Sequence, residues 1–176
     1  AVKEASHGET RLFIQLIDFL SIRRRPQAEQ YFRQFLTITE EHRDKLNMEG
    51  ENEEKIREHL SSCTDDELDR ILSERELEAL RKGCRERVTD VEFEHIRNLP
   101  EVLPDLFAKA SLRAKAAGFD GVELHYAHAY TMASFLSVKN DRDDDYGGSR
   151  NNRVRLPLEV FQKVREEVGN DYTVGC

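Results

Sequence analysis

The fourteen residues Ala117–Tyr130, AGFDGVELHYAHAY, contain the end of a predicted helix, a short connection, a predicted strand and the polar residues that follow it. Apolar residues recur at helical spacing from Leu103 to Ala117, and Gly118 stands where a left-handed C-terminal cap belongs. Only Gly118–Asp120 separates this helix from Gly121–Tyr126, whose apolar alternation predicts a strand. A buried strand that follows a helix so closely is typical of parallel α/β folds.

The same pattern extends to both sides of this stretch. Two further apolar runs, Leu12–Ile17 and Tyr172–Cys176, predict strands, and Arg153–Val168, closed by Gly169, predicts a helix. Strands that alternate with helices through short loops predict parallel βαβ units. The chain of 176 residues is shorter than the roughly 250 residues that a complete (β/α)8 barrel usually needs.

The region between the first two strands is predicted to be helical and acidic. A first helix is expected over Ala28–Thr39, and residues 40–67 carry eleven Asp or Glu against four Lys or Arg. Three capping-box patterns predict helix starts, because a hydroxyl and a carboxylate three residues apart satisfy two free backbone N–H groups. They are Thr64-x-x-Glu67, Ser73-x-x-Glu76 and Thr89-x-x-Glu92. The polar stretch 49–55 is expected to be exposed. We therefore expect one domain, 1–176, with a helical insertion over about 40–88.

Composition excludes several classes of protein. The net charge of −8 argues against general nucleic-acid binding, which normally needs a basic face. No apolar run approaches the roughly 20 residues of a membrane-spanning helix, so no membrane partner is expected. Cys63, Cys84 and Cys176 are too widely spaced for a CxxC metal motif or a disulfide framework, which favours a cytoplasmic protein without a metal site.

The strand Gly121–Tyr126 and the residues after it carry side chains that can donate or accept protons. Alternation places Glu123 and His125 on one face of the strand, and an apolar core would not select an acid and an imidazole there. His128 and Tyr130 follow within five residues of His125. Because functional groups of parallel α/β folds gather at the carboxyl ends of strands, we expect an active site here.

The polar loop that follows does not match a calcium site. Asp141, Asp143 and Asp145 have the spacing of a calcium loop, but Tyr146 occupies the position that requires glycine and Asn152 the position that requires glutamate. The run Gly147–Ser149 is interpreted as a turn, with Asn151 or Asn152 as N-cap of the next helix.

These residues together resemble a known family. Gly118–His125, His128-x-Tyr130, Phe135–Ser137, then Asn140-x-Arg142-x-Asp144-x-Tyr146-Gly-Gly-Ser149 and Asn152-Arg153 form one ordered block similar to the old yellow enzyme family. Its members are FMN-dependent NADH:flavin oxidoreductases, many of them ene-reductases. Phe13–Leu16 resembles the third barrel strand of the family.

The resemblance implies a partial (β/α)8 TIM barrel that covers roughly strands three to five. It implies FMN as cofactor, NADH or NADPH as reductant and a small electrophilic molecule as substrate. It assigns Gln15 to the flavin, His125 and His128 to the electron-withdrawing group of the substrate, and Tyr130 to proton donation. Two N–H donors would stabilise the charge that builds on a substrate oxygen, and a phenol could supply the proton.

Two alternatives stay open at this point. His125 and His128 could be ligands in a metal-dependent TIM-barrel hydrolase, although no third ligand is fixed by the sequence. The chain could also be a non-catalytic truncated fragment. In the family the last strands supply the phosphate site, so we expect the isolated chain to bind FMN weakly or not at all. The sequence leaves open whether the complete protein is a homo-oligomer.

Overall fold

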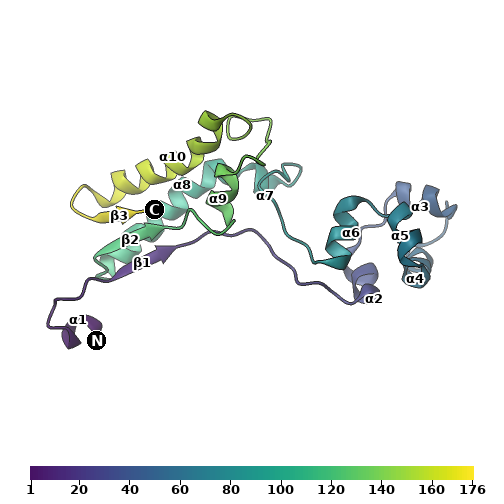
Figure 1. The fold of residues 1–176 in the computed structure, drawn as a ribbon, viewed down its shortest axis with the longest axis horizontal. Coiled ribbons are helices and arrows are strands. Elements are labelled where there is room, and N and C mark those ends of the chain that lie inside the picture. Colours follow the sequence, from purple (N-terminus) through teal and green to yellow (C-terminus); the bar gives the residue numbers. More distant parts are fainter. The chain divides into compact units, whose positions relative to one another are not determined.

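The computed structural model describes all residues, 1–176, and the chain forms two compact units. The sheet unit consists of Ala1–Leu20 and Arg87–Cys176, and the helical unit consists of Ser21–Glu86. Both units are α-helical in part, but only the sheet unit contains a β-sheet (Figure 1).

Three parallel strands form the sheet in the order β1-β2-β3. They are β1 (Phe13–Leu16), β2 (Gly121–Leu124) and β3 (Thr173–Gly175). In register, Gln15 lies opposite Glu123, and Glu123 lies opposite Gly175. The three predicted strands and their parallel arrangement are confirmed, each a little shorter than expected.

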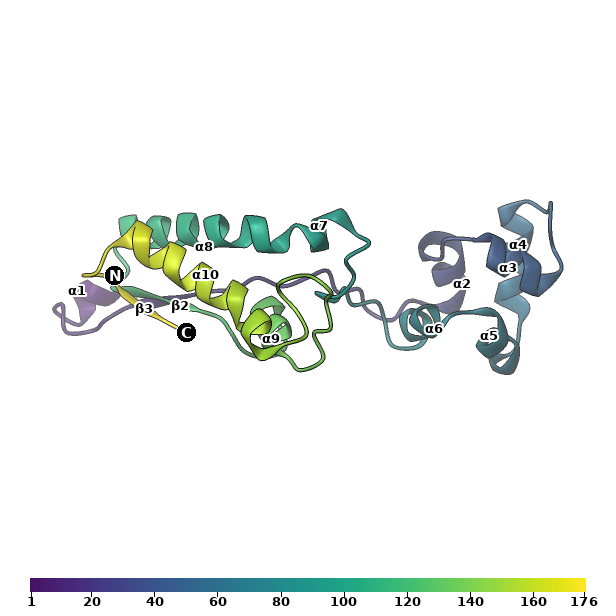
Figure 2. The ribbon, with the colours of Figure 1, turned by 90° about the horizontal axis from the view of Figure 1, so that it is seen from above.

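Two long helices cover one face of this sheet (Figure 2). They are α8 (Leu99–Ala116) and α10 (Arg150–Val168), and their apolar side chains pack with Val122 and Leu124 in one core. Three shorter helices complete the unit: α1 (Val2–Ala5), α7 (Glu94–Arg97) and α9 (Thr131–Leu136). The opposite face of the sheet is open, with Phe13, Gln15 and Glu123 exposed.

Helix boundaries in the sheet unit differ from expectation at three points. Helix α8 begins at Leu99, ahead of Leu103, because Pro100 fits the first turn of a helix, where no N–H is needed. The predicted start at Thr89 is wrong. Asp90 instead accepts the backbone N–H of Arg87 at 2.7 Å in a turn, and α7 begins at Glu94. The N-cap of α10 is Ser149, whose hydroxyl accepts the N–H of Asn152 at 3.2 Å.

The helical unit is a cluster of short helices around its own apolar core. Its elements are α2 (Ala28–Gln30), the π-helix η1 (Tyr31–Phe35), α3 (Glu40–Leu46), α4 (Glu53–Ser62), α5 (Asp65–Ile71) and α6 (Glu74–Arg81). The capping boxes at Thr64 and Ser73 are present as predicted. The core contains Phe32, Ile56 and Leu60, all nearly inaccessible to solvent.

The predicted helix Ala28–Thr39 is too long. It ends at Phe35, where Arg57 donates to the backbone oxygen of Leu36 at 2.8 Å, and Thr39 instead caps α3. Because Tyr31 and Phe32 pack into the helical core, the unit extends back to Ser21, ahead of residue 40. None of the helices in either unit has the length and apolar character needed to span a membrane.

Candidate active site at the carboxyl end of the second strand

His125 directly follows β2 and is held by the neighbouring strand. Its backbone N–H donates to the oxygen of Leu16 at 2.9 Å, which continues the parallel ladder, and the residue is 4% exposed. Nε2 of His125 and Nδ1 of His128 are 3.2 Å apart and share a hydrogen bond. The strand therefore fixes one imidazole, and that imidazole contacts the second.

The loop after β2 returns Tyr130 towards these histidines. His128 and Ala129 both adopt left-handed backbone conformations with φ of 56°, which is uncommon for residues other than glycine. The ring of His125 lies 5.0 Å from that of His128 and 5.4 Å from that of Tyr130, between centroids. Strained backbone of this kind is concentrated at functional sites. The structure thus brings three of the four predicted site residues together.

The loop after β1 supplies two residues that the sequence analysis did not identify. The backbone oxygen of Asp18 accepts the N–H of Thr131 at 3.3 Å, and the ring of Phe19 lies 6.0 Å from that of Tyr130. Asp18 Oδ2 and Thr131 Oγ1 are buried without a hydrogen-bond partner. The sequence signal for Asp18 and Phe19 was their position directly after a predicted strand, because the carboxyl ends of adjacent parallel strands meet at one edge of the sheet.

Gln15 lies apart from this cluster, on the open face of the sheet. Its side-chain N–H donates to Glu123 Oε1 at 2.6 Å, across the β1–β2 register. This bond leaves the amide oxygen of Gln15 and its second N–H uncommitted. The open face therefore presents one group that both donates and accepts hydrogen bonds, on the strand next to His125.

A second tyrosine nearby has a structural role. The hydroxyl of Tyr126 donates to the backbone oxygen of Pro157 at 2.7 Å, and burial raises the pKa of the phenol. Tyr126 therefore fastens the strand end to α10, whereas the hydroxyl of Tyr130 has no such partner.

The metal-hydrolase hypothesis requires a third ligand near the histidine pair. No group of three or more His, Cys, Asp or Glu side chains is placed to hold a metal ion in this structure.

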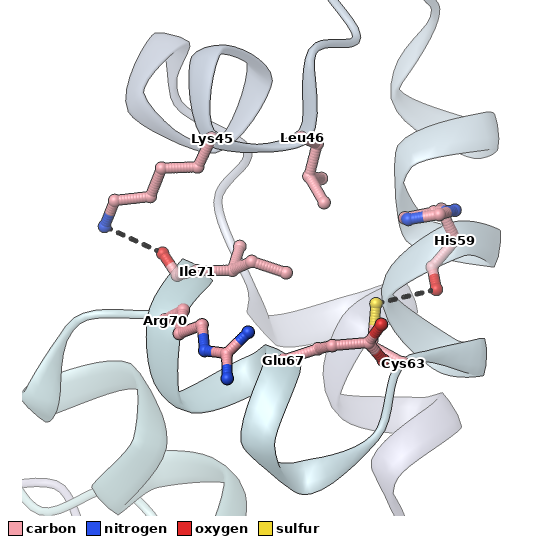
Figure 3. A pocket seen from close by; sticks show the side chains of 7 residues that line it. All are labelled: Lys45, Leu46, His59, Cys63, Glu67, Arg70 and Ile71. Atoms are coloured by element: carbon pink, nitrogen blue, oxygen red, sulfur yellow. Dashed lines mark hydrogen bonds between the residues drawn. The ribbon is translucent and has the colours of Figure 1, made fainter.

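The helical unit contains a separate cavity of about 260 Å³ (Figure 3). Lys45 points to the backbone oxygen of Ile71, to which it donates at 3.0 Å, and also pairs with Glu41. Burial, together with the charge of Glu67, raises the pKa of the Cys63 thiol, so this thiol is protonated at neutral pH. Cys63 is therefore not an activated nucleophile.

The fold and the site define an α/β protein with acid–base side chains at the carboxyl end of a parallel strand, an arrangement typical of enzymes. Residues 42–176 match the profile of the NADH:flavin oxidoreductase / NADH oxidase family. The chain belongs to this family, whose members use the flavin FMN together with a nicotinamide reductant.

Two curated relatives show the extent of the similarity. The chain is 45% identical over 80 residues to an NADH oxidase of Thermoanaerobacter brockii, a match that covers 45% of this chain and 12% of the relative. It is 47% identical over 77 residues to 12-oxophytodienoate reductase 2 of Arabidopsis thaliana, covering 43% of this chain and 20% of the relative. The chain thus spans a fifth or less of the length of these two relatives.

Among solved structures, the chain is similar to a morphinone reductase in complex with tetrahydroNAD. The TM-score is 0.40 at 44% identity, and the match covers 44% of this chain and 21% of that chain.

Proposed function

We propose that this chain is the proton-donating and substrate-binding part of an FMN-dependent oxidoreductase. The enzyme would use NADH or NADPH to reduce activated alkenes or related small electrophiles. The observation that carries the proposal is the cluster of His125, His128 and Tyr130 at the end of β2, beside an open sheet face that presents Gln15. Family membership supplies the flavin and the nicotinamide.

For the fold of the complete enzyme we propose a (β/α)8 barrel, with β1, β2 and β3 as its third to fifth strands. Helices cover only one face of the sheet, as they do on the outside of a barrel. A hollow of about 320 Å³ also flanks β1 beside α8, where Leu106 is 53% exposed. Apolar surface beside an edge strand supports the packing of a further element there.

Gln15 suits the pyrimidine edge of a flavin. That edge offers both donor and acceptor groups, and the side-chain amide of Gln15 has a free oxygen and a free N–H. Glu123 orients the amide from the neighbouring strand through the 2.6 Å hydrogen bond. When bound, the reduced flavin supplies the hydride.

His125 and His128 would bind the electron-withdrawing group of the substrate. Their facing nitrogen atoms are 3.2 Å apart, so two N–H groups at these positions would repel each other unless both donated to one acceptor beside the pair. A substrate oxygen that replaces the mutual hydrogen bond would accept from both rings. Two fixed donors then stabilise the negative charge that develops on this oxygen when hydride adds to the β-carbon.

Tyr130 would donate the proton that completes the reduction. Its ring contacts those of His125 and Phe19, with centroids 5.4 Å and 6.0 Å away, and Tyr130 is the N-cap of α9. In the proposed complex the phenol would lie beside the histidine-bound end of the substrate, where a proton is needed on the α-carbon. A phenol is a sufficiently strong acid for this step only when it is close and oriented, and the turn at His128 and Ala129, which brings Tyr130 near His125, supports this role.

The proposal is tested on protein expressed from its complete reading frame. We expect the purified protein to be yellow and to keep its activity with a chelator present. Gln15→Ala should weaken FMN binding about tenfold, the loss expected for one or two hydrogen bonds. Gln162→Ala, on the exposed surface of α10, is the matched control and should bind FMN normally. A colourless protein, or activity abolished by the chelator, would contradict the proposal and favour the metal-hydrolase alternative.

A further inference from the structure

Arg142 is a buried arginine that takes no direct part in the proposed reaction. Its side chain has no exposed surface, yet it lies in the polar loop between α9 and α10. The guanidinium donates to the backbone oxygens of Val88 at 2.8 Å, Ile96 at 3.3 Å and Arg97 at 3.3 Å. The last two are the end of α7, where a positive charge is favoured.

Asp144, whose side chain is 37% exposed, is the ionic partner of this buried guanidinium. The guanidinium pairs with its carboxylate at 2.5 Å. Partial burial acts to raise the pKa of Asp144, but hydrogen bonds from Arg142 and the Tyr146 backbone hold it below its usual value. The pair therefore stays charged at neutral pH, and the planar fork of arginine matches the carboxylate in a way that lysine does not.

Arg142 and the nearby Asn140 also contact α9. The guanidinium lies 5.4 Å from the ring of Phe135, a fully buried residue of α9. Asn140, two residues before Arg142, is also buried, and its amide donates to the oxygen of Phe135 at 2.9 Å and to that of Tyr146 at 2.8 Å. The loop thus contacts the carboxyl end of α9 through both the ring and the backbone oxygen of Phe135.

Tyr130 lies at the other end of this six-residue helix. Its backbone oxygen accepts the N–H of Ser134 at 2.8 Å, and the Ser134 hydroxyl donates to the oxygen of Ala129 at 3.2 Å. A helix this short is not stable by itself, so tertiary contacts set its orientation. We propose that Arg142, paired with Asp144, is the positioning residue that sets the place of Tyr130 beside His125 by anchoring α9 against the segment before α8.

The test uses NMR of the chain labelled with ¹³Cζ-tyrosine and ¹⁵N-histidine. Arg142→Lys keeps the charge but loses the fork, and it should shift the signals of Tyr130, Tyr146 and the two site histidines. The signals of Tyr172 in the sheet unit and Tyr31 in the helical unit should stay in place.

Arg165→Lys is the matched control. Arg165 also donates to backbone oxygens, those of Gly169 at 2.7 Å and Tyr172 at 2.6 Å, near the carboxyl end of α10. This variant should shift Tyr172 and leave Tyr130 unchanged. The proposal is overturned if Arg142→Lys leaves Tyr130 and the site histidines unshifted. It is also overturned if all tyrosines of the sheet unit shift together, since Arg142 would then support the whole unit.

The catalytic consequence rests on the proposed function and is measured in the flavin-loaded enzyme. Arg142→Lys should slow alkene reduction about tenfold, a modest loss of proton-transfer geometry, and leave flavin reduction by NADH unchanged. If the wild-type enzyme binds no flavin, the proposed function fails while the NMR result still decides the positioning role. If both half-reactions of the variant match the wild type, the positioning role is wrong and the proposed function stands.

Discussion

Ala129 adopts a backbone conformation that an alanine side chain disfavours. With φ at 56°, it and His128 form the turn that returns Tyr130 to His125. A left-handed conformation costs a residue with a Cβ roughly 1–2 kcal/mol. We therefore expect Ala129→Gly to raise the free energy of unfolding by about 1 kcal/mol, measured by chemical denaturation.

Ala127→Gly is the control for this substitution, because Ala127 lies in the same loop without a positive φ. It should leave stability unchanged or lower it slightly. If both glycine variants destabilise the protein equally, the turn is not strained at Ala129.

At the scale of single residues, the sequence was sufficient to predict that three of the candidate site residues would lie together. His125, His128 and Tyr130 follow a strand whose alternation is clear, so their meeting at the strand end could be predicted. Phe19 and Asp18 directly follow another predicted strand, but the sequence analysis did not single them out. They approach the cluster only because β1 pairs with β2 in a specific register, which the sequence does not encode locally.

Helix α10 depends on a cap that differs from the predicted one. The hydroxyl of Ser149 accepts the N–H of Asn152 at 3.2 Å, whereas Asn151 and Asn152 lie inside the helix. Ser149→Ala should therefore lower the free energy of unfolding by about 1 kcal/mol, a typical loss for an N-cap. Asn151→Ala should change it by less than about 0.5 kcal/mol, as for most exposed positions. An opposite order in thermal or chemical unfolding would identify the asparagine as the cap.

At the scale of elements, local sequence patterns predicted the helices and strands whose formation depends on neighbouring residues. The strands and the capping boxes at Thr64 and Ser73 follow from alternation and from hydroxyl–carboxylate spacing. Helix α9 was missed because its position depends on contacts that are distant in the sequence, such as the hydrogen bond from the Thr131 N–H to the backbone oxygen of Asp18. Helix α4 was missed because its first turn is entirely polar, although Ile56 and Leu60 behind it are buried.

The two ends of the helical unit lie side by side. The N–H of Arg23 donates to the oxygen of Cys84 at 2.7 Å, and the N–H of Glu86 donates to the oxygen of Ser21 at 3.0 Å. Gly83 adopts φ of 104° beside the Arg25 backbone, and a Cβ there would collide with it. Since its ends meet and its core is its own, the unit has the properties of an inserted module.

We expect a peptide of residues 21–86 to fold alone, because its apolar core is complete within that range. Its circular dichroism should show helix that melts cooperatively. A control peptide without α4 and α5 lacks Ile56, Leu60 and Leu68 and should not fold. Gradual, non-cooperative melting of the 21–86 peptide would contradict the division into two units.

The central claim concerns the whole enzyme, and it predicts that Tyr130 acts in only one of two half-reactions. Stopped-flow absorbance of the flavin in a Tyr130→Phe variant separates them. Flavin reduction by NADH should proceed at the wild-type rate, because no proton from Tyr130 is needed. Oxidation of the reduced flavin by an activated alkene should slow about 10²–10⁴-fold, the usual contribution of a general acid. Equal slowing of both half-reactions, or of neither, would contradict the account.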